Sequence, residues 1–85
     1  MNVPQRIILI SAPDKKGLVY HISSVLYELG LNIERNDEYV DKEILRFFMR
    51  THTCGEVDDR ILKNKLESIL PPHSTLTIQP TSKKN

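Results

Sequence analysis

The sequence has few cysteines, glycines and aromatic residues and almost no net charge. Its 85 residues include one cysteine, no tryptophan and three glycines. A lone cysteine cannot form an intramolecular disulfide, which fits a reducing compartment. Twelve basic and eleven acidic side chains give a net charge of +1, so the chain lacks the basic field of nucleic-acid and anionic-membrane binders. We therefore expect no nucleic-acid partner and no membrane partner.

Long apolar runs and enzyme motifs are also absent. No apolar run approaches the roughly 20 residues that span a bilayer, and the start MNVPQRIILIS lacks the pattern of a cleavable signal peptide, so we expect a cytoplasmic protein. There is no HExxH, Cys-x-x-Cys, GxSxG or Walker lysine loop. His21, His52 and His73 share no metal-ligand spacing with Cys54. We expect no catalytic residue, metal or cofactor in this chain, and we interpret Cys54 as a small, half-buried residue.

The hydrophobic pattern predicts four strands and two helices in the order β-α-β-β-α-β. Two apolar runs are expected to form the central strands. The isoleucine-rich run 6–11 should be covered on both faces of the sheet, and the second run spans residues 44–51. The polar run 31–40 is typical of an edge strand, and a turn follows near residues 41–43. The run 74–80 alternates, with Leu76 and Ile78 inward, and Pro80 ends it.

The first helix has a clear apolar stripe and a helix-ending glycine. Asp14 is predicted to be its N-cap, Gly17 falls in the predicted first turn, and Gly30 is predicted to close the helix. Glycine in a helical turn costs about 1 kcal/mol relative to alanine, so Gly17 needs an explanation. The stripe consists of Leu18, Ile22, Val25, Leu26 and Leu29.

The second helix opens at residues 55–60 and stops before the two prolines at 71–72. Its predicted buried stripe is Ile61, Leu62, Leu66, Ile69 and Leu70. In the strand that begins at Ile44, alternation predicts Leu45, Phe47 and Met49 on one face, and Arg46, Phe48 and Arg50 on the other.

This order of elements predicts an α+β fold, a ferredoxin-like βαββαβ sandwich. It has a four-stranded antiparallel sheet with two helices on one face and the two apolar strands in its centre. The other face would then expose Phe48 with either Ile7 and Leu9 or Ile8 and Ile10. We expect a second copy or another domain to cover this surface; alternatively, the aliphatic stems of Arg46 and Arg50 shade it.

Gly17 and Asn32 are candidate ligand-binding residues. A glycine at a helix N-terminus lets a carboxylate approach the backbone amides. Asn32 offers a hydrogen-bond donor and an acceptor, either close to Gly17 in the same chain or from a partner chain. Together they suit an amino acid. The structural alternative is that Gly17 allows close helix–strand packing and Asn32 caps a turn.

The same topology occurs in RNA-binding RRM domains and in acylphosphatases. RRM domains stack bases on aromatic residues of both central strands. Here the run RIILIS has no aromatic residue and ILRFFMRT lacks the glycine of that signature, although Phe48 lies between two arginines. The stretch APDKKGL does not supply the phosphate-binding arginine loop of acylphosphatases. We keep RNA binding as a minor alternative.

Residues 11–50 resemble an ACT domain, with Asp14, Gly17 and Asn32-Ile33 at the positions of that family's motifs. PDKKGLV, GLNI, DEYVD and RFFMR, in this order, resemble the N-terminal ACT domain of formyltetrahydrofolate deformylases. The resemblance implies a regulatory domain that senses a small amino acid, glycine or methionine. We also expect it to form a homodimer through sheet or helix surfaces. The resemblance also implies a missing formyltransferase-like domain that hydrolyses 10-formyltetrahydrofolate to formate and tetrahydrofolate for purine biosynthesis.

On this resemblance we expect an ACT regulatory domain over residues 1–80, followed at 81–85 by a tail or the start of a linker to the missing catalytic domain. This chain alone would not be an enzyme. A stand-alone ACT protein that docks on another enzyme is the main alternative. The expected ligand-binding residues are Asp14, Lys15, Lys16, Gly17, Leu18 and Asn32.

Overall fold

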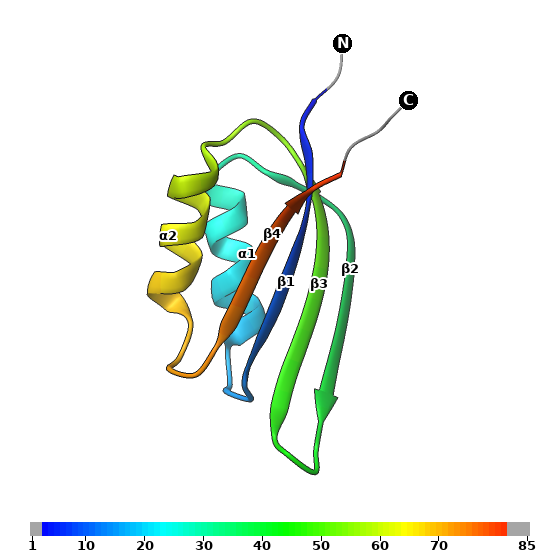
Figure 1. Ribbon diagram of the computed structural model, residues 1–85, viewed down its shortest axis with the longest axis vertical. Coiled ribbons are helices and arrows are strands. Elements are labelled where there is room, and N and C mark those ends of the chain that lie inside the picture. The colour runs from blue at the N-terminus through cyan, green and yellow to red at the C-terminus, as the bar shows by residue number, and fades with distance from the viewer. Residues whose placement is uncertain (1–2, 82–85) are drawn as a thin grey trace.

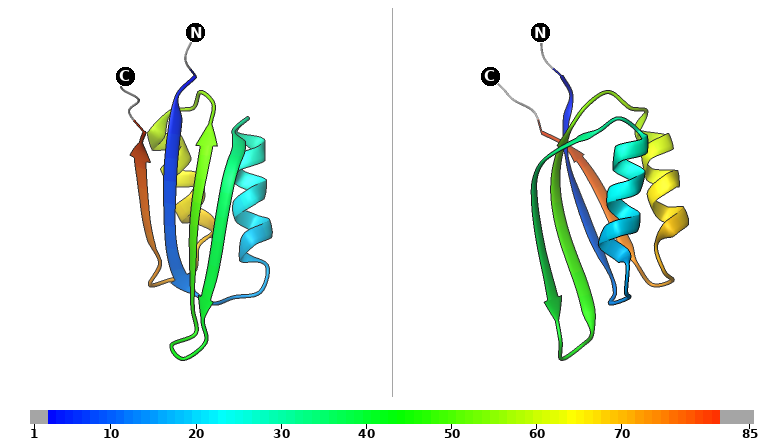
Figure 2. Two further views of the ribbon diagram at one scale, coloured as in Figure 1. Left: turned by 90° about the vertical axis from the view of Figure 1, so that its right-hand side faces the viewer. Right: turned by 180° about the vertical axis from the view of Figure 1, so that it is seen from behind.

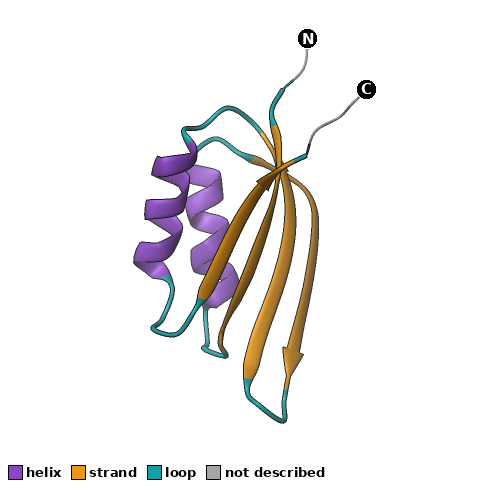
Figure 3. Ribbon diagram, in the orientation of Figure 1, coloured by secondary structure: helices purple, strands orange, loops and turns teal. Residues whose placement is uncertain are grey.

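The computed structural model describes residues 3–81 and confirms the predicted order of elements (Figures 1 and 3). The predicted tail at 81–85 lies outside the described residues, apart from Thr81. The elements are β1 (Gln5–Pro13), α1 (Leu18–Glu28), β2 (Asn32–Asp41), β3 (Arg46–Cys54), α2 (Asp59–Ile69) and β4 (Thr75–Pro80).

The four strands form one antiparallel sheet in the order β2-β3-β1-β4, with the apolar strands β1 and β3 in the centre as predicted. Both helices cover the same face of this sheet, and the opposite face is bare (Figure 2). We call this bare surface the open face. It carries Ile7 and Leu9 from β1 and Phe48 from β3, because Ile8 and Ile10 are buried on the helix side.

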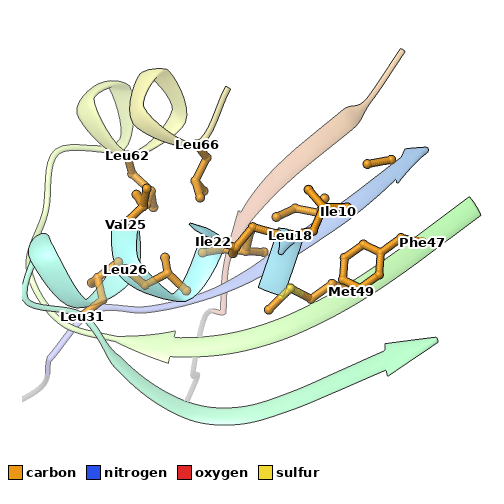
Figure 4. Packing of buried hydrophobic residues seen from close by; sticks show 12 residues of the cluster. Ile10, Leu18, Ile22, Val25, Leu26, Leu31, Phe47, Met49, Leu62 and Leu66 are labelled. Atoms are coloured by element: carbon orange, nitrogen blue, oxygen red, sulfur yellow. The ribbon is translucent and has the colours of Figure 1, made fainter. Parts of the chain in front are cut away.

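The core lies between the sheet and the helices (Figure 4). Ile22, Leu26, Leu62 and Leu66 have no exposed surface, and each such side chain contributes about 1.5–3 kcal/mol by its burial. Leu18 and Val25 of α1 are also buried, and Leu29 packs against the core, so the predicted stripe of α1 is confirmed. Leu76 and Ile78 of β4 also pack against the core, as expected.

The predicted end of α1 is confirmed, whereas its predicted start is wrong. Gly30 has a φ of +78°, and the amides of Gly30 and Leu31 donate to the carbonyls of Tyr27 and Leu26, which is the Schellman pattern. At the start, Gly17 rather than Asp14 is the N-cap residue, with a φ of +87°. A left-handed conformation is easy only for glycine, so this backbone angle alone accounts for the glycine.

A buried arginine that the sequence pattern did not reveal holds β1 against the start of α2. Arg6 is 8% exposed. Its guanidinium donates to Asp59 Oδ1 at 2.6 Å, to the carbonyl oxygen of Gly55 at 2.9 Å and to that of Val57 at 2.7 Å. These bonds fix the loop between β3 and α2.

Three predictions about burial are wrong. Ile61 is 48% exposed, because it lies about 100° around the helix from Leu62 and so falls outside the stripe. Leu45 is 66% exposed and has a φ of +53°, since it belongs to the turn before β3 and not to the strand. Strand β1 is covered on one face only; Ile7 and Leu9 on the other face are half-buried.

Within the part of the chain that the structure describes, neither helix is long and apolar enough to cross a membrane.

Candidate functional site

The N-terminus of α1 is open to solvent and carries no side-chain cap. No side chain accepts a hydrogen bond from the first turn, and that turn contains no acidic residue. The amide of Leu18 donates to the carbonyl oxygen of Lys15 at 3.3 Å. Helix N-termini have a partial positive charge and unpaired amides, so this end of α1 can accept an anionic group.

Five of the six expected ligand-binding residues lie together at this end of the molecule. Asp14, Lys15, Lys16 and Gly17 are all exposed in the loop between β1 and α1. Leu18 is only 4% exposed, so its side chain is not available to a ligand. The loop therefore presents two ammonium groups, one carboxylate and the start of a helix.

Asn32, the sixth residue, lies at the opposite end of the sheet. It pairs in register with Cys54, which pairs with Gln5 at the start of β1, whereas the loop follows Pro13 at the end of β1. A nine-residue strand is about 25–30 Å long. The Asn32 amide nitrogen donates to Glu34 Oε2 at 3.0 Å. A single copy of the chain does not bring Asn32 to the loop.

Cys54 is half-buried, as predicted, and its surroundings disfavour a thiolate. Its Sγ donates to Glu34 Oε2 at 3.2 Å. This hydrogen bond, followed by desolvation and by the charge of Glu34, raises the pKa of the Cys54 thiol, while a hydrogen bond with Asn32 opposes the shift. Nucleophilic cysteines need a lowered pKa, so Cys54 lacks the setting of a catalytic nucleophile.

Among residues 3–81, no three His, Cys, Asp or Glu side chains are grouped to hold a metal ion. A hollow of about 310 Å³ lies elsewhere, on the open face, and its lining includes none of the six expected residues. Tyr39 and Phe48 are among the residues that line it, and their rings stack with centroids 5.9 Å apart. Alternation along the sequence predicts Phe48 on this face but not Tyr39, because Tyr39 lies in a strand rich in charged residues.

Similarity to known proteins indicates the family of this chain. The ACT domain family model matches residues 6–71. The chain is 35% identical over 83 residues to the N-terminal region of formyltetrahydrofolate deformylase from Escherichia coli K12, which covers 98% of this chain and 30% of that protein. The chain thus spans less than a third of the length of this relative.

Two solved structures share the fold. Formyltetrahydrofolate deformylase from Pseudomonas syringae pv. tomato has a TM-score of 0.81 at 19% identity, over 99% of this chain and 30% of that one. An ACT domain protein from Streptococcus pneumoniae has a TM-score of 0.74 at 26% identity, over 93% of this chain and 91% of that one. The family match, the sheet order and the paired helices together show that this chain belongs to the ACT domain family.

Proposed function

We propose that this chain is a regulatory domain that binds a free amino acid, glycine or methionine, at the loop from Asp14 to Leu18. The observation that carries the proposal is the exposed start of α1, where no side chain caps the helix. In this binding mode the effector carboxylate rests against the amides around Gly17, and Lys15 and Lys16 add positive charge nearby. The carboxylate of Asp14 accepts from the effector ammonium group.

We also propose that the domain acts in the cytoplasm as a homodimer. Asn32 would take part in effector binding only as a residue of a second copy, because it lies at the far end of its own sheet. An effector that bridges two copies favours the arrangement in which the bridge forms. Its regulatory effect is then a shift of population between arrangements, limited by its difference in affinity for them.

The 35% identity to a deformylase over 98% of this chain supports a specific setting. In it, the domain regulates a formyltransferase-like catalytic domain that hydrolyses 10-formyltetrahydrofolate to formate and tetrahydrofolate for purine biosynthesis. A second setting is a stand-alone regulatory protein that docks on a separate enzyme. The match to 91% of the length of the Streptococcus pneumoniae ACT domain protein favours this alternative. The reading frame beyond Asn85 separates the two settings.

Thermal unfolding of the 85-residue chain with each amino acid tests effector binding. A ligand at 100 times its Kd adds about 2.7 kcal/mol to the free energy of unfolding, so glycine or methionine at millimolar concentration should raise the Tm. Asp14→Asn should reduce this rise, whereas the matched variant Glu43→Gln, in the exposed hairpin turn, should preserve it. If no amino acid raises the Tm of the unmodified chain, the proposed effector site is wrong.

A further inference from the structure

The open face carries two neighbouring side-chain pairs that cross from β2 to β3. Tyr39 is the register partner of Phe48, and Asp37 is the register partner of Arg50. Residues two apart on a strand share a face, so both pairs lie on the open face. Tyr39 is 61% exposed and Phe48 is 36% exposed. All four residues line the hollow of about 310 Å³.

This arrangement is complementary to a second copy of itself. In the charged pair β2 supplies the Asp and β3 the Arg. In the aromatic pair β2 supplies the Tyr and β3 the Phe. A two-fold axis parallel to the strands and midway between β2 and β3 exchanges these strands between two facing sheets. Asp37 of each copy then lies opposite Arg50 of the other copy, and Tyr39 lies opposite Phe48. Sheets facing one another pack about 10 Å apart with interleaved side chains.

We propose that the open face is the contact between two copies of this chain, with Asp37–Arg50 ion pairs and Tyr39–Phe48 stacking formed twice across the two-fold axis. This inference rests on the proposed formation of a homodimer and not on effector binding; an effector that joins the loop to Asn32 of a second copy would need a different contact between copies. The rotation keeps both Asp14–Leu18 loops at the same end of the pair of sheets. Asn32 of the other copy therefore does not approach the loop through this contact, and the two sites can be tested separately.

Asp37 can be released for this contact at little cost. Its present partner is Arg35, at 3.3 Å, and the two side chains are 55% and 72% exposed. An ion pair that is so exposed contributes little to stability. Charge complementarity between copies chiefly sets specificity and the register of association, which suits a surface whose apolar part is small.

The size of the patch sets the expected strength of the contact. Two strands of nine or ten residues cover about 30 Å by 10 Å, or about 300 Å² per copy. A standard interface buries about 800 Å² per partner. We therefore expect a reversible dimer whose population depends on protein concentration, with Leu9 and Ile7 at its margin.

The test is sedimentation equilibrium of the 85-residue chain, from about 10 µM to about 1 mM, the range that suits a contact of this size. Arg50→Glu and Asp37→Arg should each raise the dimer dissociation constant at least tenfold. An equimolar mixture of the two variants should restore the dimer, because every charged contact across the axis then joins opposite charges. Lys42→Glu, a matched charge reversal in the hairpin turn, should leave the dissociation constant unchanged.

Several outcomes would overturn the proposal. One is a chain that stays monomeric at every concentration; another is a mixture of the two variants that stays monomeric. A dimer that ignores both charge reversals but is abolished by Asn36→Pro assigns the contact to the edge of β2 instead. Retention of single-stranded RNA that Phe48→Ala abolishes assigns the open face to RNA. Circular dichroism verifies that each variant is folded. A dimer that persists while no amino acid raises the Tm contradicts the effector site only.

Discussion

The backbone amide of Asp14 donates a hydrogen bond to the carbonyl oxygen of Leu45 at 2.9 Å. This bond joins the loop before α1 to the turn between β2 and β3. Leu45 has a φ of +53°, and its side chain is 66% exposed. A bulky residue thus adopts a left-handed conformation that costs an L-residue about 1–2 kcal/mol, with little burial of its side chain in return.

Replacing Leu45 by a residue that tolerates this conformation should stabilise the domain. We expect Leu45→Asn to raise the free energy of unfolding by about 0.5–1 kcal/mol, because asparagine adopts the left-handed region more readily. Urea denaturation measures the change. The control is Ile44→Asn, since Ile44 is 62% exposed and has no positive φ. Equal effects of the two substitutions would contradict this account.

The positive φ of Gly17, rather than the space around it, should decide which substitutions the domain tolerates at this position. A Cβ atom at Gly17 would lie 3.7 Å from the ring of His21, an ordinary contact, but the φ is +87°. We therefore expect Gly17→Ala to lower the free energy of unfolding by about 1–2 kcal/mol and Gly17→Asn to lower it by less. A larger loss for asparagine in thermal or chemical unfolding would show that space, not conformation, limits this position.

Arg6 should contribute more to the free energy of unfolding through its hydrogen bonds to backbone carbonyls than through its ion pair with Asp59. Arg6→Met removes the donors to the carbonyl oxygens of Gly55 and Val57, and we expect it to lower the free energy of unfolding by about 2–3 kcal/mol. The Asp59 side chain is 70% exposed, so Asp59→Asn should cost less than about 1 kcal/mol. Chemical denaturation at neutral pH compares the two variants, and similar losses would refute this division.

Cys54 should react slowly with alkylating reagents at mildly alkaline pH. The raised pKa of the Cys54 thiol, caused mainly by its hydrogen bond to Glu34, keeps it protonated above its usual range. Glu34→Ala should move the pH profile of iodoacetamide labelling to lower pH, whereas Glu38→Ala should leave it in place. An unmoved profile in the Glu34 variant would contradict the assignment.

The same shift has a consequence for stability. The folded state holds the proton of the Cys54 thiol more tightly than the unfolded state does. The stability that this proton contributes is therefore fully present at a pH below the pKa of the thiol in the unfolded state. It is lost as pH rises through the raised pKa of the folded state. We expect the Tm difference between the unmodified chain and Cys54→Ser to narrow over that interval, as measured by thermal unfolding across alkaline pH. A difference independent of pH would contradict the linkage.

Features that depend on local spacing could be predicted from the sequence. The stripe from Leu18 to Leu29 repeats with the period of a helix, and Gly30 supplies the left-handed residue that the helix end requires. The apolar runs indicated the central strands, because the apolar content of a run is also a local feature of the sequence. With the alternation of polar and apolar residues, these features were enough for the fold.

Features that depend on contacts between distant segments could not be predicted. The hydrogen bonds of Arg6 reach residues 49 to 53 positions away, and nothing near Arg6 in the sequence signals them. Gly17 and Asn32 were predicted to form one site because their chemistry suits the two charged groups of an amino acid, and that argument does not say where the fold places them. The connection through α1 returns the chain from the end of β1 to the edge of the sheet where β1 begins, so Gly17 and Asn32 lie at opposite ends.

The carbonyl oxygen of Gln5 accepts from the amide of Thr81 at 3.1 Å, so the first and last backbone segments that the structure describes lie side by side, far from Asp14. Any polypeptide joined to either segment would meet the domain at that shared exit. An amino acid held at the opposite loop could therefore influence such a neighbour only by a change relayed down the strands or by drawing another copy into place. If the domain binds an amino acid as we propose, it also acts as a spacer that keeps the bound molecule away from any polypeptide joined at that end.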